Sequence, residues 1–190
     1  MPKVHIVDDD AAIRDSLDWL FRSRGVACAT WPSAEKFLAA WRPDLAGCLL
    51  LDIRMSGMSG LALFDRLKAI GCPLPVIFLT GHGDVPSAVA AIKKGARDFV
   101  EKPFNDNDLV DRVLAALAED DRRRDRAARL AGLTAREREI MDLVLAGRLN
   151  KQIADDLGIS MRTVEVHRAH VFEKMGVKTA VELARLLATA

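Results

Sequence analysis

Two apolar runs in the sequence end directly in carboxylates. The stretch Cys48–Asp52 places four apolar residues ahead of one aspartate, a pattern typical of a strand buried on both faces of a parallel sheet. Val4–Val7 is a shorter run of the same kind, and the aspartates at positions 8–10 follow it. Side chains at the carboxyl ends of parallel strands lie beside the ligand crevice. Taken alone, Asp52 fits a site residue and a loop cap equally well, and Asp10 suits a helix cap.

The residue types at these strand ends predict a site for a cation and a phosphoryl group. Carboxylates that meet in one crevice repel one another, by about 4 kcal/mol per pair at ~4 Å and an effective dielectric near 20. Mg²⁺ would offset this repulsion, since it binds through one or two carboxylates and keeps positions for phosphate oxygens and water. Later strand ends supply the hydroxyl of Thr80 and the ammonium of Lys102, which can hold a phosphoryl oxygen. A lone strand-end lysine is more often a solvated surface group, so Lys102 counts only together with the other strand ends.

The elements that would position these residues alternate along the first 120 residues. Five strands alternating with five helices predict an α/β fold, a parallel sheet with helices on both faces. A flavodoxin-like, doubly wound sheet in the order 2-1-3-4-5 would bring Asp8, Asp9 and Asp52 together at its switch point. The expected strands are 4–7, 26–30, 48–52, 76–80 and 98–101, and the expected helices are 12–24, 33–40, 61–70, 85–94 and one beginning near Asn105.

Residues 1–118 resemble the receiver domain of two-component response regulators. The motifs that carry the resemblance are Ile6-Val7-Asp8-Asp9, Leu51-Asp52-Ile53-Arg54-Met55, Phe78-Leu79-Thr80-Gly81 and Asp98-Phe99-Val100-Glu101-Lys102-Pro103-Phe104. The resemblance implies that Asp52 accepts a phosphoryl group from the phosphohistidine of a sensor histidine kinase. It also implies that Mg²⁺ is held by Asp8, Asp9, Asp52 and the backbone carbonyl of Arg54.

The resemblance assigns the remaining motif residues as well. Thr80 and Lys102 would bind the phosphoryl oxygens, because transfer to a carboxylate mainly needs charge neutralisation and positioning. Phe99 would be the aromatic residue that moves on activation, with plain core packing as the alternative. The same pattern predicts a cis peptide bond between Lys102 and Pro103, although only ~5–6% of X–Pro bonds in folded proteins are cis.

Two segments after the predicted strands, one beginning at Met55 and one at Gly81, carry further features. Met55 is followed by Ser56 where the resembling sequences carry proline, so a locked φ angle is lost and the rigidity of this loop is in question. The stretch Gly81–Pro86 resembles the FixJ branch of the family. Its His82 could influence the lifetime of the phosphoryl group, but a solvent-facing loop residue is the favoured interpretation.

The last third of the chain predicts a helical DNA-binding domain. Residues 119–132 form a charge run in which acidic residues are interleaved with basic ones, and we expect a solvated helical linker. Thr134–Glu137 is a capping box, Asn150 is expected to cap the next helix, and Ser160 a third that runs to about Met175. A fourth helix is expected over 179–188. The short turn after the second of these helices makes a helix-turn-helix arrangement.

The third of these helices divides into two faces at 100° per residue. Val164, Val171 and Met175 share one stripe, with His167 at its edge, and the opposite arc combines small, apolar and charged groups that suit a major groove. Flanking lysines suit phosphates. Residues 133–190 resemble the LuxR/NarL (GerE-type) DNA-binding domain through Leu-Thr-Ala-Arg-Glu-Arg-Glu, Asn-Lys-Gln-Ile-Ala and Arg-Thr-Val-Glu-Val-His-Arg. The expected DNA contacts are Lys151, Arg162, Thr163, Glu165, Val166, Ala169, Lys174 and Lys178.

Composition agrees with this division of the chain. Residues 1–120 carry 14 Lys+Arg and 17 Asp+Glu, whereas residues 121–190 carry 14 and 10, so only the second part favours a polyanion. Cys28, Cys48 and Cys72 lie in or beside apolar stretches, which predicts buried free thiols in a reducing compartment. No apolar run approaches the ~20 residues of a membrane helix, and the N-terminus lacks an export signal. We therefore expect a cytoplasmic protein with no membrane partner.

Together the two resemblances predict a FixJ-like response regulator and not an enzyme. The expected parts are a receiver at 1–118, a linker at 119–132 and a helix-turn-helix domain at 133–190. Phosphorylation would promote a homodimer through the fourth helix, fifth strand and fifth helix, and the expected partners are a sensor histidine kinase, double-stranded DNA and RNA polymerase. The helices of this dimer face carry the apolar residues Val89, Ile92, Leu109 and Val113.

Two alternatives remain open. In the first, the chain binds DNA constitutively and its receiver is only a dimerisation module. In the second, the chain is a phosphatase of the haloacid dehalogenase type, which also uses an aspartate after an apolar strand. That family needs a second aspartate two residues later, where this sequence has Arg54.

Overall fold

The computed structural model describes residues 3–81 and 85–188. The chain divides into two compact units, Met1–Asp121 and Arg122–Ala190. The boundary between them falls within a long helix, α5 (Asp106–Ala131), which includes most of the predicted linker. The suggestion about His82 lies outside the described residues.

The first unit is built on a parallel sheet. In the residues that the structure describes, five strands pair in the order β2-β1-β3-β4-β5, which confirms the predicted topology. Val7 pairs with Leu51, so Asp8, directly after β1, and Asp52, the last residue of β3, lie at the carboxyl ends of neighbouring strands. The strands are β1 (Lys3–Val7), β2 (Cys28–Trp31), β3 (Gly47–Asp52), β4 (Val76–Thr80) and β5 (Asp98–Glu101).

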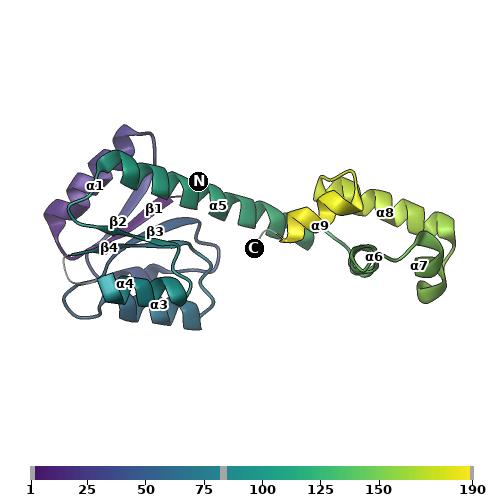
Figure 1. Cartoon of the computed structure of the whole chain (residues 1–190), viewed down its shortest axis with the longest axis horizontal. Coiled ribbons are helices and arrows are strands. Elements are labelled where there is room, and N and C mark those ends of the chain that lie inside the picture. Colours follow the sequence, from purple (N-terminus) through teal and green to yellow (C-terminus); the bar gives the residue numbers. More distant parts are fainter. Residues whose placement is uncertain (1–2, 82–84, 189–190) are drawn as a thin grey trace. The chain divides into compact units, whose positions relative to one another are not determined.

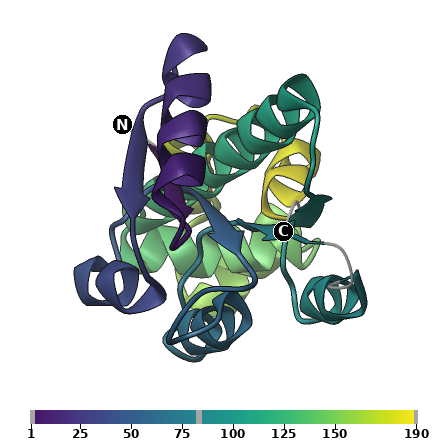
Figure 2. The same ribbon diagram turned by 90° about the vertical axis from the view of Figure 1, so that its left-hand side faces the viewer.

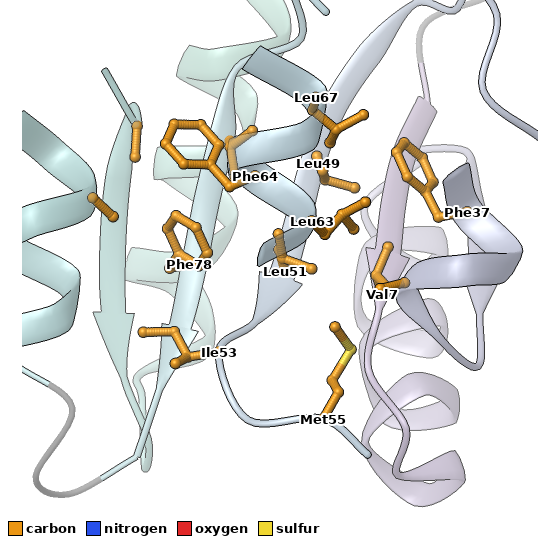
Figure 3. Close-up of a cluster of buried hydrophobic side chains, with 14 of the residues drawn as sticks. Val7, Phe37, Leu49, Leu51, Ile53, Met55, Leu63, Phe64, Leu67 and Phe78 are labelled. Carbon is orange, nitrogen blue, oxygen red and sulfur yellow. The ribbon is translucent and has the colours of Figure 1, made fainter. Parts of the chain in front are cut away.

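Helices cover both faces of this sheet. α1 (Ala11–Ser23) and α5 pack on one face, and α2 (Ala34–Ala40), α3 (Gly60–Ala69) and α4 (Val85–Lys93) on the other (Figures 1 and 2). Side chains of β3 alternate between the two layers because successive residues of a strand point to opposite faces. Leu49 and Leu51 therefore join the cluster under α2–α4, drawn in Figure 3, whereas Cys48 and Leu50 join the cluster under α1 and α5.

Two expectations about the first unit were wrong. The second strand begins at Cys28 and not at Val26, because the Val26 N–H donates to the Phe21 carbonyl (3.0 Å) and so finishes the end of α1. Leu109 and Val113 are fully buried against the sheet and cannot form part of an exposed dimer face.

The cysteines only partly match their prediction. All three are free thiols, but only Cys48 is fully buried, while Cys28 and Cys72 are half-buried. Burial raises the pKa of the Cys28 thiol to about 11, so this thiol stays protonated near neutral pH.

The second unit is a small bundle of helices. Those that follow α5 are α6 (Ala135–Leu145), α7 (Asn150–Leu157), α8 (Met161–Met175) and α9 (Ala180–Ala188). The capping box is confirmed: Glu137 N–H donates to Thr134 Oγ1 (3.2 Å) and Thr134 N–H to Glu137 Oε2 (2.8 Å). Their shared core includes Ile140, Ile153, Val164, Val171, Met175 and Leu183.

The predicted cap of the second helix in this bundle was wrong. Asn150 is the first residue of α7, and its side chain accepts from the Arg168 guanidinium of α8 instead of capping its own helix. The Leu149 N–H is satisfied by Gln152 Oε1 at 2.9 Å. Ser160 does cap α8, as predicted, by accepting from the Thr163 N–H (3.1 Å).

Across 3–81 and 85–188, the structure contains no helix with the length and apolar character needed to span a membrane.

Asp120 connects α5 to the start of β3 and generates the first testable prediction. Its carboxylate is 1% exposed and accepts the Gly47 N–H at 2.9 Å. Asp120→Ala leaves that buried donor without this partner, so we expect the free energy of unfolding to fall by about 1–3 kcal/mol in urea denaturation. The exposed neighbour Asp121 provides the control, since Asp121→Ala also deletes a carboxylate, but one that faces solvent. Equal losses for the two variants would contradict this role of Asp120.

Candidate functional site

The carboxyl ends of β1 and β3, together with the segment after β5, surround a crevice of about 290 Å³. A cavity needs about 10–15 Å³ of such volume to hold one water molecule, so the crevice has room for a hydrated ion and a phosphoryl group. Its lining residues are Asp8, Asp9, Asp10, Ile13, Asp52, Arg54, Gly81 and Lys102. The structure thus brings together the predicted carboxylates and the predicted lysine.

Lys102 lies between two of the carboxylates. Its Nζ is 2.7 Å from Asp52 Oδ1 and 3.1 Å from Asp8 Oδ2. Burial raises the pKa of Asp52, against the opposing effect of the Lys102 hydrogen bond. Burial alone would lower the pKa of Lys102, but its hydrogen bond to Asp52 and the charges of both carboxylates outweigh this and raise it. The ammonium therefore remains charged and offsets the repulsion between the two aspartates.

Asp9 has a different partner, on the loop between β3 and α3. The Ser56 N–H donates to Asp9 Oδ2 at 2.8 Å. This backbone hydrogen bond, followed by one from the Ser56 hydroxyl, lowers the pKa of Asp9. The sequence showed Ser56 only as the loss of a proline, whereas the structure shows that the same change supplies a donor that proline lacks.

Asp10 and Arg14 complete the first strand end. Asp10 caps α1 by accepting the Ala12 N–H (2.9 Å), as expected, and its own N–H donates to Asp8 Oδ1 (2.9 Å). The Arg14 guanidinium donates to the Asp8 carbonyl at 2.7 Å. Arg14 was not among the predicted site residues, because the sequence pattern placed it simply on a helix.

The oxygen donors of this crevice fit Mg²⁺ without forming a closed cage. Among the described residues, no three His, Cys, Asp or Glu side chains converge into a group that could enclose a metal ion. The contacts explain this, since Lys102 separates Asp8 from Asp52 and Asp9 is tied to Ser56. Mg²⁺ usually keeps several waters and takes one or two carboxylates, and the oxygen donors of this crevice are compatible with that mode of binding.

Thr80 is the last residue of β4, and Phe99 lies within the neighbouring β5, where it pairs with Phe78. Thr80 is fully buried and its hydroxyl donates to the Val100 carbonyl on β5 at 3.4 Å. Phe99 is half-buried, packs against the cluster under α2–α4 and lines a second groove beside Pro103 and Phe104. The peptide bond between Lys102 and Pro103 is cis, which confirms that prediction.

In the second unit, α8 divides as predicted. Val164, Val171 and Met175 are buried, and His167 is half-buried at the edge of that stripe. The opposite arc is exposed and includes Arg162, Glu165, Val166 and Ala169, and the predicted contact Thr163, outside that arc, is exposed as well.

The three lysines expected to flank this face are not equivalent. Lys151 on α7 and Lys178 before α9 are exposed. Lys174 instead places its Nζ 2.7 Å from Glu137 Oε2, and the Glu137 side chain is buried. A phosphate contact by Lys174 would compete with this ion pair. The sequence identified Glu137 only as a member of a capping box, because nothing local links it to a lysine 37 positions later.

The fold and the crevice define a receiver-like α/β unit joined to a helix-turn-helix unit, and comparisons with known proteins agree. Residues 4–114 match the family described as response regulator receiver domain. Residues 131–187 match bacterial regulatory proteins of the luxR family.

Relatives of known function resemble the whole chain. The C4-dicarboxylate transport transcriptional regulatory protein DctR of Rhodobacter capsulatus is 56% identical, covering 96% of this chain and 98% of its own. FixJ of Azorhizobium caulinodans is 47% identical, covering 96% of this chain and 90% of its own. The crystal structure of full-length FixJ from B. japonicum is 44% identical, with a TM-score of 0.59 over 97% of this chain and 95% of that one.

The chain therefore belongs to the two-component response regulators that join a receiver to a LuxR-type DNA-binding domain, the group that contains FixJ and DctR. A receiver implies a histidine kinase partner, and the luxR-type domain implies DNA binding.

The ion pair inside the second unit generates a pH prediction. Hydrogen bonds from Lys174 and Thr134 lower the pKa of Glu137 from 4.5 to about 2. A carboxyl with a depressed folded-state pKa stabilises the fold fully above its unfolded pKa and loses that contribution as the pH falls. The melting temperature of the second unit should therefore drop between about pH 5 and pH 2, and Glu137→Gln should flatten this dependence. Thermal unfolding across that range is the measurement, with the exposed Glu139→Gln as control. A parallel pH profile in Glu137→Gln would contradict the prediction.

Proposed function

We propose that Asp52 is the phosphoacceptor of this response regulator. The observation that carries the proposal is the Lys102 ammonium placed between Asp52 and Asp8 in an open crevice. In the reaction, an Asp52 carboxylate oxygen forms a bond to phosphorus while the bond from phosphorus to the kinase histidine nitrogen breaks. The product carries extra negative charge beside Asp8, so a cationic surrounding is required.

Four oxygen donors of the crevice would hold Mg²⁺ in this proposal: Asp8, Asp9, Asp52 and the backbone carbonyl of Arg54. When bound, the ion supplies positive charge to the phosphoryl oxygens. Lys102 then holds a phosphoryl oxygen with an ammonium that already contacts Asp52. The Thr80 hydroxyl would give up its hydrogen bond to the Val100 carbonyl (3.4 Å) and donate to a second phosphoryl oxygen.

We propose that Phe99 couples phosphorylation to a change in the protein surface. Phe99 is half-buried on β5, where it pairs with Phe78 of β4. Movement of Thr80 would free space for the ring to turn, which biases the neighbouring surface between two packings. On that surface Val89 and Ile92 of α4 are exposed. We propose that this face, without the buried Leu109 and Val113, forms the homodimer after phosphorylation.

The second unit is proposed to read DNA with the exposed arc of α8. Arg162, Glu165 and Val166 offer a charged donor, an acceptor and an apolar group for base edges. Ala169 lies on the same arc and Thr163 beside it. Lys151 and Lys178 would contact phosphates, and Lys174 would do so by giving up its ion pair with Glu137. Paired units would engage two half-sites about one helical turn apart, and RNA polymerase would be the partner at the promoter. We keep 1–118, 119–132 and 133–190 as the proposed receiver, linker and DNA-binding domain.

A haloacid dehalogenase-type phosphatase is the weaker candidate. Such an enzyme needs an acid–base carboxylate two residues after the nucleophile, and Arg54 occupies that position. A guanidinium cannot take a proton from water near neutral pH.

Asp52→Asn tests the phosphoacceptor. The substitution keeps the side-chain volume but removes the nucleophilic carboxylate, so a small-molecule phosphodonor with Mg²⁺ should give no adduct by mass measurement. The natural chain should carry one phosphoryl group, and so should the control Asp15→Asn, which alters an exposed residue of α1. An adduct formed as efficiently in Asp52→Asn would place the phosphoacceptor elsewhere, and steady hydrolysis of phosphate esters would support the phosphatase.

Ala169→Glu tests the DNA-reading face. A carboxylate there would face the phosphates of the groove, and we expect affinity at fixed salt to fall by about tenfold or more. The DNA is a fragment selected from a random library by the natural chain. Ala127→Glu, an exposed alanine of α5, adds the same charge away from α8 and should have a smaller effect. Unchanged affinity in Ala169→Glu would show that this arc does not enter the groove.

A further inference from the structure

The hydrogen bond between Ser56 and Asp9 joins two segments that both belong to the proposed metal site. It runs from the loop after β3 to the end of β1, with 2.8 Å between Ser56 N and Asp9 Oδ2. The Asp9 side chain is exposed, so its carboxylate has little other packing to hold it in one orientation. The same loop is held from its other side by Glu35, whose Oε1 accepts the Met58 N–H at 2.9 Å.

The position of Ser56 relates this bond to the cation. Ser56 stands two residues after Arg54, whose carbonyl is one of the proposed ligands. Tying Asp9 to Ser56 therefore keeps the carboxylate beside the loop segment that would supply another oxygen. A carboxylate has two oxygens, and the bond to Oδ2 leaves Oδ1 able to bind a cation.

We propose that Ser56 is a positioning residue for Mg²⁺: its backbone N–H orients the Asp9 carboxylate before the ion arrives. The inference rests on the proposed metal site, which it deepens. Metal-bound carboxylates are commonly oriented by outer hydrogen bonds of this kind. An exposed side chain that is already ordered loses less conformational entropy on binding. A proline at this position would have no N–H to donate.

Two substitutions at one position separate the donor from the hydroxyl. Ser56→Pro removes the backbone N–H, whereas Ser56→Ala keeps it and removes only the hydroxyl. We expect the Kd for Mg²⁺ to rise by about threefold to tenfold in Ser56→Pro and by less in Ser56→Ala. The measurement is calorimetric titration of the full, unphosphorylated chain with magnesium chloride.

Glu35→Ala is the matched control for loop mobility. It frees the same loop from its other anchor but leaves the bond between Ser56 and Asp9 in place, so the Kd for Mg²⁺ should stay near that of the natural chain. Melting temperatures without Mg²⁺ report how much each variant disturbs the loop and the fold. Equal loss of Mg²⁺ affinity in Glu35→Ala and Ser56→Pro would overturn the proposal, because loop rigidity alone would then account for it.

A second comparison uses Asp9→Ala as the background, because this substitution leaves no side-chain acceptor for the Ser56 N–H. If Ser56 acts through Asp9, adding Ser56→Pro to Asp9→Ala should not weaken Mg²⁺ binding further. An unchanged or tighter Kd in the single variant Ser56→Pro would overturn the inference while leaving the metal site intact. Absence of Mg²⁺ binding in the natural chain would instead overturn the metal site itself, and the inference with it.

Discussion

The crevice depends on one cation, the Lys102 ammonium, placed between two buried aspartates. The sheet brings Asp8 and Asp52 together because β1 and β3 are parallel neighbours and Val7 pairs with Leu51. The carboxylates of two aspartates that are 2% and 7% exposed as whole residues repel strongly without a compensating charge. Lys102 can supply that charge only if β5 ends at the same edge, on the far side of β4. The order β1-β3-β4-β5 is therefore what brings these three side chains to one edge of the sheet.

The same contact would also help the crevice to accept additional negative charge. Transfer of a phosphoryl group to Asp52 would add charge where a carboxylate pair already stands. The ammonium at 2.7 Å from Asp52 and a hard cation beside Asp8 and Asp9 would share that charge. Thr80 ends β4 and Phe99 lies in the neighbouring β5, and we propose that a change at Asp52 reaches the surface of α4 through these two residues.

Much of this arrangement was predictable from local patterns. The apolar run before Asp52 and the aspartates after Val7 identified both strand ends, because buried parallel strands carry uninterrupted apolar residues. The division of α8 into Val164 and Val171 on one side and Arg162 and Ala169 on the other follows from helical periodicity alone. Such patterns can be recognised in the sequence because each is formed by residues that are close together in the chain.

What the sequence could not show are contacts between distant side chains. Lys174 reads as a phosphate contact until the structure pairs it with buried Glu137. Asn150 has the residue type of a helix cap, yet it accepts from Arg168 of another helix. In the sequence, Ser56 shows only that a proline is absent. Its hydrogen bond to Asp9 spans 47 positions, so no local pattern indicates it. Leu109 and Val113 are apolar in either setting, and only packing reveals that they are buried.

The most direct test of this account is sedimentation of the full chain with and without a phosphodonor and Mg²⁺. The account predicts a mostly monomeric chain that becomes a dimer on phosphorylation, and no such change when Asp52 is replaced by asparagine. A stable dimer in both states, or a phosphorylated chain that remains monomeric, would contradict it.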